Sequence, residues 1–175
     1  CPALGCDAAL PRVADGEIWV NATVPAVDAS ALDGVLARFD GCRTAKIKVA
    51  ERGQTLADDV PRVSGVRARL GADARLRIDA NGGWSVDEAI EALRELSRFG
   101  LEYAEQPCAT TAELVELRRR LVEAGIPVEI AADESIRKAE DPLEVARLGA
   151  ADVIVVKMQP LGGVRRAAEI VEAAG

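Results

Sequence analysis

Charged residues recur at the ends of short apolar segments along this chain, at intervals that match one strand and one helix. After Lys48, the next residues of this kind are Asp79, Glu105, Asp133 and Lys157, at steps of 31, 26, 28 and 24 residues. The strands of a parallel α/β barrel bring their C-terminal ends to one mouth, so residues far apart in sequence become neighbours there. The spacing therefore predicts a repeated strand-helix fold in which these charged side chains converge.

Six apolar segments are expected to be strands, each followed by a helix. The expected strands cover residues 17–24, 45–50, 75–79, 102–105, 128–132 and 152–156. The expected helices cover residues 29–39, 55–70, the stretch AIEALREL, and residues 111–124, 142–148 and 162–173. Ser85 and Glu88 form a capping-box pattern just before AIEALREL, which marks the start of that helix. This alternation predicts one all-parallel sheet.

The length of the chain limits how much of a barrel these units can close. The chain has 175 residues, whereas a closed (β/α)₈ barrel typically has about 250. We therefore expect residues 1–175 to form one partial TIM-type barrel domain with about six of the eight βα units, as a fragment of a longer chain. A doubly wound open α/β sheet is the alternative, but its ligands gather at one switch point rather than at five strand ends.

The composition argues against several classes of function. The formal net charge of -7 disfavours binding to nucleic acid or to an anionic membrane, since either needs a basic surface. No apolar run reaches the roughly 18 residues that a membrane-spanning helix needs. The four cysteines form no CxxC pair, so we expect reduced thiols and a cytoplasmic location.

Three carboxylates at strand ends predict a metal site. The chain has no histidine, which removes Ser-His-Asp and Cys-His catalysis and leaves oxygen atoms as the metal ligands. Asp79, Glu105 and Asp133 would repel one another at one mouth unless a cation lay between them. Oxygen ligands favour a hard divalent ion, so these residues predict an Mg²⁺ or Mn²⁺ site. Taken singly, each of them is more often a helix cap or a surface salt bridge.

Three lysines are expected beside these carboxylates. Lys46 and Lys48 alternate along one strand, so both side chains point to the same face. Desolvation and a neighbouring ammonium both lower the pKa of a lysine, which can then act as a general base; an exposed edge-strand face is the alternative. Lys157 is expected to face the mouth from the opposite side, or else to extend into solvent. This set of groups suits removal of a proton α to the carboxylate of a small-molecule substrate.

Five motifs carry a resemblance to a known family. TAKIKVA, RIDANGGW, YAEQP, AADES and VVKMQPLGG, in this order, resemble the enolase superfamily and, within it, the muconate-lactonising-enzyme-like subgroup. The resemblance covers residues 19–175 and implies a barrel with Asp79, Glu105 and Asp133 as Mg²⁺ ligands. The family pattern also includes an N-terminal capping domain and a seventh and eighth barrel strand, and this sequence shows neither.

The same resemblance implies a role for each remaining candidate residue. Lys48 would abstract the α-proton, with Lys46 supporting its lowered pKa, and Lys157 would stabilise the enediolate from across the ring. Four further residues would orient the ligands, although each is equally well explained by capping or turn hydrogen bonds: Asn81, Gln106, Glu134 and Ser135.

The resemblance also narrows the reaction. LEYAEQPCATTAEL and IAADESIRKAEDP are most similar to enzymes of menaquinone biosynthesis that dehydrate a hydroxycyclohexadiene carboxylate. Racemisation of an N-acylamino acid or epimerisation of a dipeptide is the second reaction that the family implies, with Lys48 and Lys157 as the two bases. Cycloisomerisation of a muconate is the third. A non-catalytic alternative is an inactive fragment, or a subunit that needs a complementing segment. The oligomeric state is not predicted.

Overall fold

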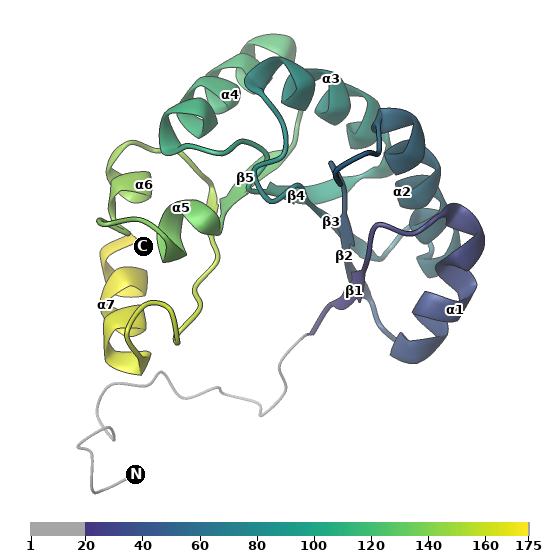
Figure 1. The fold of residues 1–175 in the computed structure, drawn as a ribbon, viewed down its shortest axis with the longest axis horizontal. Coiled ribbons are helices and arrows are strands. Elements are labelled where there is room, and N and C mark those ends of the chain that lie inside the picture. The colour runs from purple at the N-terminus through teal and green to yellow at the C-terminus, as the bar shows by residue number, and fades with distance from the viewer. Residues whose placement is uncertain (1–19, 175) are drawn as a thin grey trace, which may run out of the picture.

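The computed structural model describes residues 20–174 of the chain. Six parallel strands form one sheet whose spatial order equals the chain order (Figure 1). These strands are β1 (Ala22–Val24), β2 (Thr44–Lys48), β3 (Arg75–Asp79), β4 (Leu101–Glu105), β5 (Glu129–Ala132) and β6 (Val153–Ile154). Among the strands of residues 20–174 the order never reverses, so this part of the sheet has no switch point. The expected barrel-type α/β architecture is confirmed, and the doubly wound alternative is wrong.

The helices lie along the outer side of the curved sheet, as Figure 1 shows for α1 to α4. The α-helices of residues 20–174 are α1 (Leu32–Leu36), α2 (Leu56–Leu70), α3 (Val86–Leu96), α4 (Thr111–Ala124), α5 (Glu134–Arg137), α6 (Glu144–Arg147) and α7 (Val164–Ala174). In the described part of the chain, β1 and β6 form the two edges of the sheet. The sheet therefore makes up an arc of a barrel.

Capping side chains determine where the central helices begin. The predicted box at the start of α3 is confirmed, since the Glu88 carboxylate accepts a hydrogen bond of 2.8 Å from the backbone N–H of Ser85. The same arrangement starts α4, where Glu113 accepts a bond of 2.9 Å from the N–H of Thr110. Both boxes satisfy N–H groups that a helix leaves unpaired at its first turn.

The alternation of side chains along the strands separates an apolar outer face from a charged inner face. Ile47, Leu76 and Ile78 are fully buried in the core between sheet and helices. Their neighbours in β2 and β3 include Lys46 and Arg77, which point to the other face because successive strand residues alternate. The core thus fixes the register of the strands, and the register fixes which charged residues share the inner face.

Three expectations about the elements need correction. The strand expected at 152–156 is only Val153–Ile154, and it is half-buried rather than buried on both faces, because it lies at the edge of the sheet. Helix α5 is missed, since a single turn carries no helical periodicity. The strand expected at 17–24 is β1 at Ala22–Val24, and its residues 17–19 lie outside the described residues.

No helix within residues 20–174 has the length and apolar character to cross a membrane. Cys42 and Cys108 are free thiols, as expected, whereas Cys1 and Cys6 lie outside the described residues. Burial raises the pKa of the Cys108 thiol to about 12. That thiol therefore stays protonated at neutral pH.

Candidate active site

The register of the sheet brings the first predicted residues side by side. Lys48 in β2 pairs with Asp79 in β3, which in turn pairs with Glu105 in β4. Adjacent strands lie about 4.8 Å apart, so these three side chains form one row at the C-terminal ends of the strands. Asp133 directly follows β5, the next strand of the sheet. Four of the predicted residues therefore end four consecutive strands.

The three carboxylates are buried at this row. Asp79, Glu105 and Asp133 are 0%, 1% and 1% exposed, so none of them is the surface salt bridge that each could have been on its own. Burial raises the pKa of the Glu105 carboxyl above its ordinary value; the hydrogen bond from Lys46 opposes this shift, and the charge of Asp79 adds to it. Carboxylates held together in this way need cations beside them.

Two lysines of β2 supply positive charge on one side of the row. Lys46 Nζ lies 2.9 and 3.1 Å from the two carboxylate oxygens of Glu105 and 3.3 Å from Asp79 Oδ2. Lys48 Nζ donates to Asp79 Oδ2 at 2.7 Å and to Asn81 Oδ1 at 2.5 Å. Both lysines thus face the mouth, as predicted. The alternative of an exposed strand face is wrong, since their amines contact buried carboxylates.

The expected pKa of one lysine is wrong in direction. Burial by itself lowers the pKa of Lys46, but the hydrogen bond and charge of Glu105, together with the charge of Asp79, outweigh burial and raise it. The prediction of a lowered pKa for Lys46 was based on burial and on the neighbouring ammonium of Lys48. In the structure Glu105 and Asp79 contact the Lys46 amine directly, and their charges outweigh the other effects.

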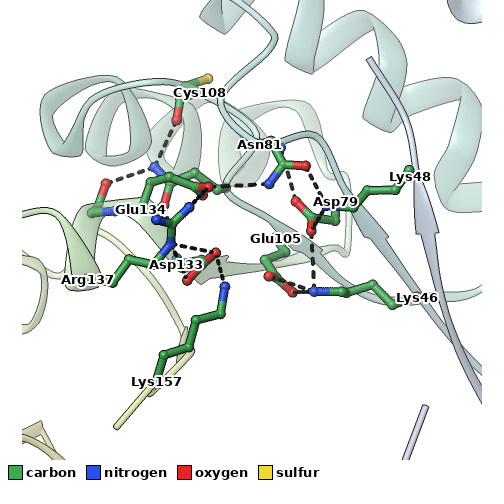
Figure 2. Close-up of polar contacts among 12 residues, drawn as sticks. Lys46, Lys48, Asp79, Asn81, Glu105, Cys108, Asp133, Glu134, Arg137 and Lys157 are labelled. Atoms are coloured by element: carbon green, nitrogen blue, oxygen red, sulfur yellow. Dashed lines mark hydrogen bonds and ion pairs between the residues drawn. The ribbon is translucent and has the colours of Figure 1, made fainter. Parts of the chain in front are cut away.

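Lys157 and an unpredicted arginine supply positive charge on the other side (Figure 2). Lys157 Nζ lies 2.6 Å from Asp133 Oδ2, across the row from Lys46 and Lys48. Arg137 lies 2.5 Å from a Glu134 oxygen, and its Nε lies 3.2 Å from Asp133 Oδ1. Arg137 is a residue of the site that the sequence pattern does not predict. The available signal was its spacing of four residues from Asp133, which places the two on one face of a helical turn.

Asn81 and Gln106 connect the strand ends, with Glu134 and Ser135 as partners. Asn81 accepts from Lys48 and donates to Glu134 Oε1 at 3.3 Å. The Gln106 side-chain oxygen accepts from the backbone N–H groups of Asp133 at 3.0 Å and Ser135 at 3.1 Å. Its NH₂ group donates to Ser135 Oγ at 2.8 Å. All four residues predicted to orient the ligands therefore lie in the site.

Unusual backbone conformations occur where three of these strands end. Within residues 20–174, the non-glycine residues with positive φ are Ala50 at 57°, Asn81 at 48° and Gln106 at 38°. Each lies one or two residues after Lys48, Asp79 or Glu105. Such conformations are costly for a residue with a Cβ and persist only where surrounding contacts hold them. The positions of these strand ends are therefore specified by the fold.

The donor set fits a hard divalent cation. Asp133 Oδ1 and Glu134 Oε2 are buried and accept no hydrogen bond from the described part of the chain. Arg137 Nε lies 3.2 Å from Asp133 Oδ1 and neutralises part of its charge, but buried anionic oxygens without a hydrogen bond still favour a bound cation. Within residues 20–174 no three acidic side chains already surround a metal position; lysine ammonium groups lie against the carboxylates instead. Each ammonium group lies at the tip of a flexible side chain and can move away. The carboxylate oxygens therefore remain available to an ion with a higher charge.

The fold and this site define a class of protein, a parallel α/β barrel with carboxylates and lysines at the C-terminal ends of its strands. Residues 30–175 match the family described as enolase C-terminal domain-like. The chain belongs to this family, so the resemblance predicted from the five motifs is confirmed.

Three relatives illustrate the similarity. The chain is 61% identical over 155 residues to o-succinylbenzoate synthase of Mycobacterium ulcerans, covering 88% of this chain and 45% of that protein. A mandelate racemase/muconate lactonizing family protein from Azoarcus sp. EbN1 is 30% identical with a TM-score of 0.75, covering 90% of this chain and 41% of that chain. A dipeptide epimerase from Cytophaga hutchinsonii, complexed with Mg and the dipeptide D-Ala-L-Val, is 29% identical with a TM-score of 0.75, covering 92% and 43%. The chain thus spans less than half the length of these relatives.

Proposed function

We propose that this chain forms the barrel part of an o-succinylbenzoate synthase that depends on Mg²⁺ or Mn²⁺ and serves menaquinone biosynthesis. The reaction is dehydration of 2-succinyl-6-hydroxy-2,4-cyclohexadiene-1-carboxylate to 2-succinylbenzoate. The 61% identity to the Mycobacterium ulcerans protein supports this substrate. The observation that carries the chemistry is the row of Lys48, Asp79 and Glu105 in register on adjacent strand ends.

In this proposal the carboxylates hold the metal and neighbouring polar groups hold the carboxylates. Asp79, Glu105 and Asp133 offer the oxygen ligands that Mg²⁺ prefers. When bound, the ion supplies positive charge beside the substrate carboxylate, where negative charge develops as the α-proton leaves. The residues that orient these ligands are Asn81, Gln106, Glu134 and Ser135.

Lys48 carries both proton transfers. Its neutral amine accepts the proton from C1 of the substrate, and the electron pair of the C–H bond moves toward the carboxylate to give an enediolate. The C6–O bond then breaks, the carboxylate is restored and the ring becomes aromatic. The Lys48 ammonium returns its proton to the departing hydroxide, so water leaves and the neutral amine is regenerated. Lysine with magnesium is already the general pattern of enolase-superfamily sites.

Lys46 and Lys157 act through charge in this proposal. Lys46 keeps a cation beside Glu105 and Asp79, at 2.9 and 3.3 Å. Lys157 lies on the side of the row opposite Lys48 (Figure 2), where its ammonium stabilises negative charge on the enediolate. A positive charge at this position is sufficient for dehydration, because the proton arrives and leaves on the Lys48 side.

Racemisation is the second candidate, and the same opposed lysines favour it. A racemase needs one base on each face of the carbon, and Lys48 and Lys157 approach from opposite sides. The similar structure from Cytophaga hutchinsonii is a dipeptide epimerase. The two candidates differ in what they require of Lys157, which is a charge for dehydration and a removable proton for racemisation.

The substitution Lys157→Arg in the complete protein separates these requirements. Arginine keeps the charge but does not give up its proton at working pH. We expect dehydration to fall by less than about 10-fold, and any racemisation of N-succinylamino acids to fall by at least about 100-fold. Both rates are measured on one preparation, with Lys138→Arg as control because Lys138 lies outside the row. Equal losses of both rates would contradict a purely electrostatic role for Lys157.

The non-catalytic alternative makes a different prediction about the native polypeptide. If the chain works only with a complementing segment, then activity appears when that segment is present and is lost from residues 1–175 alone. The length of the native reading frame and the mass of the purified protein show whether residues 1–175 or a longer polypeptide should be assayed.

A further inference from the structure

A buried ion pair on α2 lies behind the strand end that carries Lys48. Asp59 and Arg62 are each 1% exposed, and Arg62 Nη1 lies 2.6 Å from Asp59 Oδ1. Neither residue belongs to the row of carboxylates and lysines. A buried ion pair of this kind is weak evidence for stability, because packed apolar residues often serve as well. Its contacts indicate a different role.

The pair holds the backbone on both sides of Val49. Arg62 Nη1 donates to the carbonyl oxygen of Lys48 at 3.1 Å. Asp59 Oδ2 accepts from the backbone N–H of Ala50 at 3.1 Å. One side chain of the pair thus fixes the residue before Val49, and the other fixes the residue after it.

The remaining donors of Arg62 connect this point to two neighbouring loops. Its Nε donates to the carbonyl oxygen of Val27, after β1, at 2.7 Å, and its Nη2 donates to Gln54 Oε1 at 2.5 Å. Gln54 in turn donates to the carbonyl oxygen of Ala26 at 3.0 Å. Only a planar guanidinium presents donors in enough directions to reach these acceptors together.

The segment that the pair holds is strained and tightly packed. Ala50 has φ of 57°, in the left-handed region that residues with a Cβ rarely adopt. It also packs against Gly83, where an added Cβ would lie 3.0 Å from both the Cβ and the carbonyl oxygen of Ala50. A strained conformation of this kind persists only if surrounding contacts impose it.

We propose that Asp59 and Arg62 are positioning residues that set the place of the Lys48 amine by holding the backbone from Lys48 to Ala50. This inference rests on the proposed role of Lys48 as the base. Displacing a reacting group by about 1 Å can cost roughly 100-fold in rate. A shift of the strand end would therefore lower kcat while leaving substrate binding by other groups in place.

Arg67 provides a matched control on the same helix. It too donates to backbone carbonyl oxygens, including those of Ala74 at 2.7 Å and Gly100 at 3.0 Å. These residues directly precede β3 and β4, so Arg67 acts at the opposite end of the sheet from Lys48. Arg67→Ala therefore measures how much kcat falls when the protein loses an arginine that binds backbone carbonyl groups away from Lys48.

The test compares Arg62→Lys, Arg62→Ala and Arg67→Ala in the complete protein at a temperature where circular dichroism shows each to be folded. Arg62→Lys keeps a charge beside Asp59. If Arg62→Ala does not fold, the comparison rests on Arg62→Lys. We expect kcat for dehydration to fall about 30- to 100-fold in the Arg62 variants, with KM changed by less than about 3-fold. Arg67→Ala should keep kcat within about 3-fold.

Amide hydrogen exchange provides a second readout that does not depend on activity. The Ala50 amide should exchange at least about 10-fold faster in Arg62→Lys than in Arg67→Ala. Wild-type kcat in Arg62→Lys, or an Ala50 amide as slow as that of Arg67→Ala, would overturn the inference. If Lys48→Ala keeps full turnover, the proposed base is wrong, and exchange at Ala50 alone then decides whether the pair positions this segment.

Discussion

Replacement of Lys48 by alanine in the complete protein is expected to lower kcat for dehydration by about 100- to 10,000-fold, the usual contribution of a general acid–base group. The reason is the position of its amine at the end of β2, 2.7 Å from Asp79 Oδ2. Without this amine, Lys46 is the lysine left on that side of the row in the described residues, and its raised pKa makes it a poor acceptor for the α-proton. The rate of 2-succinylbenzoate formation measures the effect.

Metal affinity and a fourth lysine provide the controls for this variant. Mg²⁺ should bind no more weakly to Lys48→Ala, because the substitution removes a positive charge beside Asp79 and leaves every carboxylate in place. Lys138→Ala, which lies outside the row, should keep turnover. Retained dehydration in Lys48→Ala would show that another group is the base.

Replacement of Asp133 by asparagine is expected to weaken Mg²⁺ binding by at least about 100-fold, since outer contacts of metal sites alone contribute 10- to 100-fold. Asp133 is 1% exposed, and its Oδ1 accepts no hydrogen bond from the described residues. The substitution removes the charged oxygen that we propose as a ligand and changes the shape of the side chain little. Calorimetric titration with Mg²⁺ measures the change.

An exposed aspartate provides the matched control for charge. Asp141 is half-exposed and pairs with Arg147 on the surface, so Asp141→Asn removes the same charge without touching the row. Its Mg²⁺ affinity should match that of the wild type. If Asp133→Asn also binds Mg²⁺ with wild-type affinity, Asp133 is not a ligand.

Most of the fold could be predicted because local and global signals agree. Strands β2 to β5 are short segments that end at a charged residue or directly before one. The central helices α3 and α4 begin at the capping residues Ser85 and Thr110. The even spacing from Lys48 to Asp133 then implies consecutive parallel strands, as the register of Lys48 with Asp79 and of Asp79 with Glu105 confirms. β6 was less predictable, because an edge strand pairs on one side only.

Lysine usage is a further sequence signal for the site. Four of the 22 basic residues are lysine, and three of these four are Lys46, Lys48 and Lys157. Apart from Lys138, the basic residues elsewhere in the chain are arginine, which does not serve as a proton acceptor. In a sequence so rich in arginine, a lysine at a strand end indicates a position where an amine is needed.

Interactions between distant segments could not be read from the sequence. The direction of the Lys46 pKa depends on which charges lie closest, and Glu105 is 59 residues away in the chain. The contacts of Arg62 with Val27 and Lys48 span 35 and 14 residues and involve backbone carbonyl groups, which leave no mark in the sequence. Such partners become visible only when the helices pack on the sheet.

The most direct measurement of the central claim is the rate at which the complete protein converts the hydroxycyclohexadiene carboxylate to 2-succinylbenzoate, before and after the metal is removed with EDTA. We expect dehydration that is lost on chelation and restored by Mg²⁺ or Mn²⁺, and that is faster than racemisation of N-succinylamino acids by the same preparation. Dehydration that survives chelation, or racemisation without dehydration, would contradict it.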